Sequence, residues 1–200
     1  MNLPNWITVA RFVMAVVFCA LLAQYDARRP AGLTWILDVC FWLFIIAALS
    51  DVLDGYLARK HDQVTSFGRI IDPFVDKVLV GGAFILLAGR NFVNDRGVSV
   101  TGVEAWMVVI IIGRELLVSS LRGASEAAGR QYAANIHGKI KMLVQSVTVP
   151  WVLISLTHFT WPWWMTGRTI MLWLTVLVTA LSMIAYLAQA RDVLAERRHA

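Results

Sequence analysis

Apolar residues are gathered along this chain into six long stretches separated by short polar segments. The stretches cover residues 7–24, 34–58, 72–89, 104–123, 141–158 and 169–189. A helix needs about 20 mostly apolar residues to cross the hydrocarbon core of a bilayer, and each stretch comes close to this length. The pattern predicts an all-α integral membrane protein with six transmembrane helices. Because no repeat or linker divides them, we expect residues 1–200 to form one domain, a single bundle.

Composition also favours a membrane protein over a soluble one. Of the 200 residues, 58% are hydrophobic and only 16% are charged, whereas a soluble domain is about half apolar and a quarter charged. The first stretch could instead be a cleaved signal peptide, but Arg11 interrupts it and no basic segment precedes it. These features are not typical of a signal peptide, so we expect the stretch to remain as a span.

The formal charge of +5 is spread among the spans and does not form one basic face. This distribution indicates anionic lipid or phosphate as the partner, and no nucleic acid. With the N-terminus inside, one side of the membrane would hold Arg59, Lys60, Arg69, Arg122, Arg130, Lys139, Lys141, Arg191, Arg197 and Arg198. The other side would hold Arg28, Arg29, Arg90, Arg96 and Arg168. The positive-inside rule then predicts a multi-pass protein of the cell (inner) membrane whose more basic side faces the cytoplasm.

Four aspartates lie near the facing ends of the second and third apolar stretches. Asp51 and Asp54 are three residues apart, and Asp72 and Asp76 are four apart, so each pair shares one face of a helix. A central Asp in a span costs roughly 2.5 to 3.5 kcal/mol on insertion scales, so such residues usually have a function. A short connector makes the two helices antiparallel, which brings both pairs to the same side of the membrane.

Four carboxylates in one pocket repel one another unless a cation lies among them. The donor set is all oxygen, with no nearby Cys or His, which favours Mg²⁺ or Mn²⁺. A set of this size can hold two ions, and two ions can clamp a pyrophosphate for an in-line attack at phosphorus. The alternative is salt bridging to Arg59, Arg69 and Lys77, although two ordered pairs of aspartates exceed the partners facing them.

Small residues accompany the aspartates. Gly55, Ala58 and Gly68 leave the helix surface open to a flat base or a diphosphate, although close helix packing explains each of them separately as well. Together with Arg59 and the four aspartates they match in full the pattern D-x2-D-G-x2-A-R-x8-G-x3-D-x3-D of the CDP-alcohol phosphotransferase family, which this chain therefore resembles.

The resemblance implies a six-helix fold and roles for individual residues. The four aspartates would be metal ligands, and Asp76 would also be the general base that deprotonates the acceptor hydroxyl. A carboxylate bound to metal on one side can accept a proton on the other. Contacts to CDP-diacylglycerol would come from Asn5, Thr8, Gly55, Ala58, Arg59, Thr65 and Gly68, the first two within an N-x2-T-x2-R pattern that ends at Arg11.

The acceptor has to be inferred from other charges. Arg114 lies inside the fourth stretch, where a lone guanidinium is costly without an anionic partner, and Arg122, Lys139 and Lys141 could join it in binding a phosphate. Pairing of these residues with Glu115 and Glu126 is the alternative. Lys139 and Lys141 are two apart, which places them on different faces of a regular helix.

The fragments around Asp72–Lys77, Gly113–Glu115 and Gly138–Lys141 most resemble the bacterial phosphatidylglycerophosphate synthases of this family. The resemblance implies that the four basic residues hold the phosphate of glycerol 3-phosphate with help from Tyr186. Met142 departs from the pattern, since a threonine is expected there. The implied reaction is attack of the glycerol 3-phosphate hydroxyl on CDP-diacylglycerol, with release of CMP.

Two other interpretations of the function stay open. Another acceptor, such as an inositol phosphate or phosphatidylglycerol, would keep the aspartate chemistry. An ion transporter would also place carboxylates in a membrane, although nearer the midplane of repeated halves. A homodimer is implied by the resemblance alone.

Overall fold

The structure is a computed structural model that describes residues 3–29, 32–60, 66–127 and 136–196. Side chains are described for the same ranges except residues 3–5, 51–60, 66–70, 137 and 189–196. The described chain forms six α-helices, a short 3-10 helix and no strand. They are α1 (Leu3–Leu22), α2 (Thr34–Lys60), α3 (Ser66–Leu87), η1 (Arg90–Phe92), α4 (Ala105–Ala127), α5 (Ile136–Ser155) and α6 (Pro162–Glu196). The prediction of an all-helical protein with six helices is confirmed.

The sixth helix is longer than the predicted stretch at both ends. It begins at Pro162 and runs for 35 residues to Glu196, whereas the predicted stretch covers only residues 169–189. Proline suits the first turn of a helix, because a backbone N–H at that position would have no partner within the helix. At the other end, residues 190–196 consist mostly of good helix formers. The polar residues at the C-terminal end account for the extension there, whereas residues 162–168 belong to the apolar segment Pro162–Ala188 and the predicted stretch began too late.

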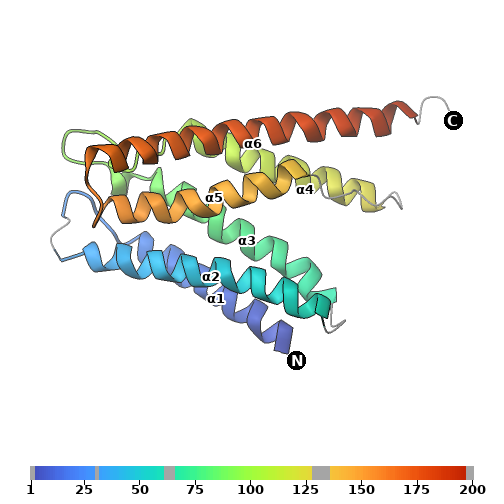
Figure 1. Ribbon diagram of the computed structural model, residues 1–200, viewed down its shortest axis with the longest axis horizontal. Helices are drawn as coiled ribbons and strands as arrows, with labels where there is room; N and C mark the ends of the chain where they lie inside the picture. Colours follow the sequence, from blue (N-terminus) through green and yellow to red (C-terminus); the bar gives the residue numbers. More distant parts are fainter. Residues whose placement is uncertain (1–2, 30–31, 61–65, 128–135, 197–200) are drawn as a thin grey trace.

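The helices form two groups of three that diverge toward one end. α1 packs against α2 and α3, and α6 packs against α4 and α5, while α5 also touches α2 and α3 touches α4 and α5. Figure 1 shows that the two groups separate toward the end where α1 starts and α6 ends. α2 and α4 end there and α3 and α5 begin there, so the groups open at the end that carries the predicted site.

The two groups differ in what they bury. Between α1, α2 and α3 the core is apolar, with Phe18, Phe44 and Phe84 inaccessible to solvent. Helices α5 and α6 instead join through buried polar side chains, among them Gln145, Thr148, Thr175 and Thr179. Polar contacts of this kind hold helices together where the surroundings are apolar.

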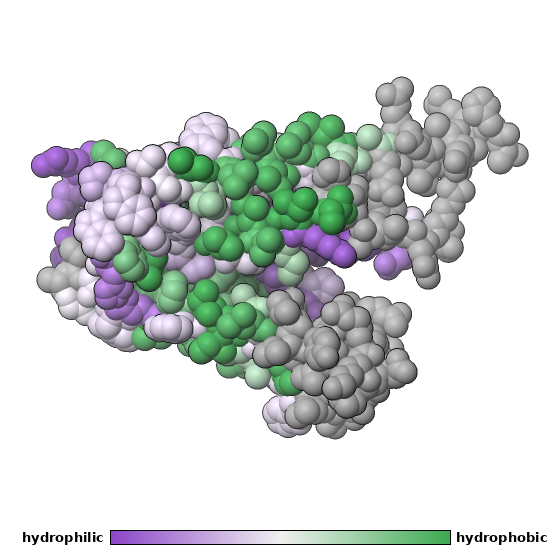
Figure 2. Space-filling view, in the orientation of Figure 1, coloured by the Kyte–Doolittle hydropathy of each residue, from purple (hydrophilic) through white to green (hydrophobic). Residues whose placement is uncertain are grey.

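Large apolar side chains are exposed on the outer face of every helix. Examples from the six helices in order are Trp6, Trp42, Phe74, Val109, Leu143 and Ile184. Figure 2 shows this apolar surface across the middle of the molecule, with hydrophilic residues at one end. Exposed apolar patches of this extent are typical of surfaces that contact lipid or other proteins.

By length and hydropathy, one stretch in the described chain is sufficient to cross a bilayer: Pro162–Ala188 in α6. Shorter apolar stretches are Trp6–Leu22 and Thr34–Ser50. Charged residues such as Asp76 and Arg114 interrupt α3 and α4 and lower their mean hydropathy.

Candidate active site

A polar cavity lies where the two groups of helices diverge. Its volume is about 570 Å³, and side chains from α3, α4, α5 and α6 line it. Figure 2 shows hydrophilic surface in the hollow between two apolar lobes at this end. Of the predicted site residues, the cavity gathers Asp72, Asp76, Arg114, Arg122, Lys139, Lys141 and Tyr186. Acidic residues of α3 thus face basic residues of α4 and α5.

Asp72 and Asp76 form the acidic side, four residues apart on α3. The Thr8 hydroxyl donates a hydrogen bond to Asp72 Oδ1 over 2.8 Å, and Arg11 Nη1 lies 3.8 Å from the same oxygen. Thr8 and Arg11 are both buried, whereas the Asp72 side chain is 40% exposed. Helix α1 therefore orients a carboxylate that remains open to the cavity.

The other predicted donor-site residues lie outside the described side chains. Asp51, Asp54, Gly55, Ala58 and Arg59 are in the helical backbone of α2, Gly68 is in that of α3 and Asn5 in that of α1; Thr65 lies outside the described residues. The end of α2 that carries Asp51 and Asp54 lies at the same end of the bundle as the start of α3 (Figure 1). This backbone arrangement is the one that a shared site needs.

Among the described side chains, no three His, Cys, Asp or Glu residues form a group able to hold a metal ion. Two of the four predicted ligands lie outside that set. The two that lie within it, Asp72 and Asp76, offer carboxylate oxygen from one face of α3, and oxygen is the donor type that Mg²⁺ prefers. By donor type, these two carboxylates suit a hard divalent cation, and the other two predicted ligands would have to complete its coordination.

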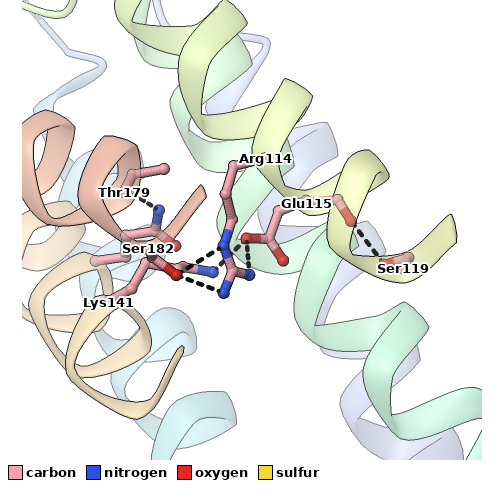
Figure 3. Close-up of polar contacts among 7 residues, drawn as sticks. Arg114, Glu115, Ser119, Lys141, Thr179 and Ser182 are labelled. Carbon is pink, nitrogen blue, oxygen red and sulfur yellow. Dashed lines mark hydrogen bonds and ion pairs between the residues drawn. The ribbon is translucent and has the colours of Figure 1, made fainter. Parts of the chain in front are cut away.

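The basic side of the cavity carries its own counter-charge. Arg114 and Lys141 are both buried, and Glu115 Oε1 accepts from Arg114 Nη1 at 2.9 Å and from Lys141 Nζ at 2.5 Å. The pairing with Glu115 that the sequence left open is present. Figure 3 shows the three side chains together, from α4 and α5. The inner cations are thus partly neutralised by a carboxylate that lines the same cavity.

Helix α6 completes the surroundings of Arg114. Ser182 Oγ accepts from Arg114 Nε at 3.2 Å and from Nη2 at 2.9 Å, and the guanidinium carbon lies 5.2 Å from the centre of the Tyr186 ring. A Cβ at Gly138 would lie 3.1 Å from the Tyr186 hydroxyl, so a larger residue would crowd it. Sequence reasoning missed Ser182, although its position four residues before Tyr186 places both on one face of α6.

Arg122 and Lys139 form an outer basic pair. Both are exposed, and both line the cavity with Arg114 and Lys141. Lys139 and Lys141 therefore reach the same cavity although they point from different faces of α5. The long lysine side chain accounts for this, because it can bend toward a cavity from either side of a helix.

A second, mostly apolar cavity of about 410 Å³ adjoins the first. Residues of α2, α3 and α5 line most of it, among them Phe44, Ala48, Leu79 and Leu143. Asp76, Lys139 and Met142 line both cavities. A polar chamber and an apolar chamber therefore meet at the predicted catalytic carboxylate.

Comparison with known proteins adds independent information. A family model described as CDP-alcohol phosphatidyltransferase matches residues 1–189. The chain is 35% identical to the CDP-diacylglycerol--glycerol-3-phosphate 3-phosphatidyltransferase of Bacillus subtilis (strain 168). The aligned region of 201 residues covers 96% of this chain and 97% of the relative. Proteins of the same name from Yersinia pestis (strain Pestoides F), with 29% identity and 98% of both chains covered, and from Rickettsia felis, with 36% identity over 60% of this chain and 58% of the relative, are also similar.

Proposed function

Since this chain belongs to the CDP-alcohol phosphatidyltransferase family, we propose that it transfers the phosphatidyl group of CDP-diacylglycerol to glycerol 3-phosphate in phospholipid biosynthesis. The products are phosphatidylglycerophosphate and CMP. The observation that carries this proposal is the cavity in which the carboxylates of α3 face the basic side chains of α4 and α5. The names of relatives that match nearly the whole chain support the same acceptor.

The donor site combines the acidic side with the apolar cavity. Asp51, Asp54, Asp72 and Asp76 would hold two Mg²⁺ or Mn²⁺ ions, which would neutralise charge that develops on the leaving CMP. Asn5, Thr8, Gly55, Ala58, Arg59, Thr65 and Gly68 contact the donor, as the family resemblance implies. The apolar cavity beside Asp76 suits the part of the lipid nearest the phosphate, because it is lined by side chains such as Phe44 and Leu79.

Asp76 acts as the general base. It lies where the polar and apolar cavities meet, so it can reach both the acceptor and the lipid phosphate. Asp76 takes the proton of the glycerol 3-phosphate hydroxyl, and the oxygen then attacks the phosphatidyl phosphorus. The bond between this phosphorus and the CMP oxygen breaks, and CMP leaves with the electron pair. No side chain needs to form a covalent intermediate in this direct transfer.

The acceptor phosphate binds to Arg114, Arg122, Lys139 and Lys141, with Tyr186 beside them. Arg122 and Lys139 are exposed and meet the phosphate first, whereas Arg114 and Lys141 lie deeper. Phosphate is well suited to such a set, because arginine offers a planar fork of donors and lysine a point charge.

All six helices span the membrane in this proposal. The shortest of them have 20 residues and extend about 30 Å, close to the hydrocarbon thickness of about 30 Å. Exposed apolar side chains on every helix suit contact with lipid. The polar cavity faces the cytoplasm, where glycerol 3-phosphate is found, and the protein lies in the cell (inner) membrane. The family resemblance implies a homodimer.

The test is CMP release from CDP-diacylglycerol by the detergent-purified protein with Mg²⁺. Glycerol 3-phosphate, inositol phosphate, phosphatidylglycerol and no acceptor are compared, each with and without a chelator. We expect release with glycerol 3-phosphate alone and its loss with the chelator. Release with inositol phosphate would change the acceptor and keep the phosphate site, whereas release with phosphatidylglycerol alone would refute the assignment of the basic residues to an acceptor phosphate. No release with any acceptor would refute the proposed transfer.

A further inference from the structure

Ser182 is fully buried in α6, where its side chain contacts Arg114 of α4. Its hydroxyl oxygen accepts two N–H groups of Arg114, Nε and Nη2, which lie on one edge of the guanidinium. Figure 3 shows the two bonds reaching the serine from α4. A bidentate contact of this kind fixes the plane of the guanidinium as well as its position.

Two further contacts restrain the same guanidinium. Nη1 donates to Glu115 Oε1, and the Tyr186 ring lies beside the guanidinium carbon at 5.2 Å. Arginine has many rotamers, and a ligand that binds a mobile arginine has to order it first. A guanidinium that is already held on several sides meets an incoming phosphate in its binding orientation.

Buried hydroxyls at nearby positions of α6 have a different role. Gln145 Nε2 donates to Thr179 Oγ1 at 3.2 Å, and Thr148 and Thr175 share a hydrogen bond of 2.8 Å. These contacts join α6 to α5. Thr179 and Ser182 are both buried on one face of α6, three residues apart, but Ser182 is the one that bonds to a residue of the polar cavity.

We propose that Ser182 is a positioning residue of the acceptor site, which holds Arg114 in the orientation that binds the acceptor's phosphate. The inference rests on the proposed function for the presence of a phosphate on the acceptor. It does not depend on which alcohol carries the phosphate, because the shared chemistry is a phosphate monoester on a fixed guanidinium. Thr179→Ala is the matched control, because it removes a comparable buried hydrogen bond, the one from Gln145, and Thr179 does not bond to Arg114.

The experiment compares Ser182→Ala with Thr179→Ala in the full-length, detergent-purified protein. Ser182→Ala removes the hydrogen bonds that hold the charged Arg114 side chain. Their loss should raise the KM for glycerol 3-phosphate about tenfold. The KM for CDP-diacylglycerol and kcat should stay within about twofold of wild type, well below the tenfold that corresponds to 1.4 kcal/mol. Thr179→Ala should lower the Tm by about as much as Ser182→Ala does, and should leave both KM values unchanged.

A second readout separates this inference from the proposed function. Inorganic phosphate is added to the metal-free protein without donor, and the rise in Tm is measured. The rise should be smaller in Ser182→Ala than in wild type and in Thr179→Ala, even if glycerol 3-phosphate proves not to be the acceptor. Equal rises in all three proteins would overturn the positioning role, as would equal KM values in the two variants. Ser182→Cys, whose sulfur is a much weaker hydrogen-bond acceptor than the hydroxyl, replaces Ser182→Ala if that variant does not fold.

Discussion

The acidic and basic sides of the cavity are balanced in different ways. On the basic side, Glu115 pairs with both buried cations, and Ser182 and Tyr186 hold one of them in place. On the acidic side, Asp72 is oriented by Thr8 and approached by Arg11 at 3.8 Å, yet its side chain is 40% exposed. The basic side is thus organised by the protein itself, whereas the acidic side keeps a carboxylate open to the cavity.

This difference suits ligands of opposite charge. A phosphate that enters the basic side meets groups that are already ordered, so little conformational freedom is lost on binding. Carboxylates held close together are stable only when a cation compensates their repulsion. We therefore expect the acidic side to depend on divalent ions for its order, and the basic side to keep its geometry without a ligand.

The largest expected effect is at Asp76, where the two cavities meet. Asp76→Asn keeps the shape of the side chain but cannot accept the hydroxyl proton, so CMP release should fall by about a thousandfold. Binding of CDP-diacylglycerol, measured by equilibrium binding in detergent, should be largely retained. Turnover near the wild-type rate would remove Asp76 from the role of base.

The next effect separates the apolar cavity from the polar one. Ala48→Phe fills part of the 410 Å³ cavity, and steric exclusion of the lipid should raise the KM for CDP-diacylglycerol with oleoyl chains about tenfold, which corresponds to about 1.4 kcal/mol. The rise should be smaller with octanoyl chains, and the KM for glycerol 3-phosphate should not change. Ile46→Phe, on an exposed position of the same helix, is the control. Equal effects on both donors would show that the cavity does not hold the lipid.

Glu115→Gln tests whether the basic side carries its own counter-charge. The variant keeps a hydrogen-bond acceptor and removes the charge that pairs with Arg114 and Lys141, and breaking a buried pair costs about 3 kcal/mol. The Tm should fall, and added inorganic phosphate should restore it further than in wild type, because phosphate replaces the lost negative charge. Glu126→Gln, at an exposed position of the same helix, should leave the Tm unchanged. If phosphate stabilised the Glu115 variant no more than wild type, Glu115 would not be the counter-charge.

The smallest effect is expected at Met142, which lines both cavities. Met142→Thr installs the residue that the family resemblance leads us to expect, and its effect on the KM for glycerol 3-phosphate should stay within about threefold, since the basic residues carry the binding. Steady-state kinetics with varied glycerol 3-phosphate measures this. A change as large as that in Ser182→Ala would place Met142 in the acceptor site.

The predicted acceptor residues illustrate how far sequence reasoning reached. It selected Arg114, Arg122, Lys139 and Lys141, and all four line one cavity. It left their pairing with Glu115 and Glu126 open, and the structure divides them into a buried pair held by Glu115 and an exposed pair. The division could not be predicted, because burial depends on how α4, α5 and α6 pack.

The sequence by itself determined the helices and the spacing of the aspartates, because hydropathy and positions three or four residues apart are local properties of a helix. It also determined the family, through a motif confined to 26 residues. Tertiary structure decided that Glu115 binds Lys141, 26 positions away, and that Ser182 binds Arg114, 68 positions away. It also decided that a polar and an apolar cavity meet at Asp76. Contacts between distant helices depend on how complete surfaces fit together, and no local pattern encodes that fit.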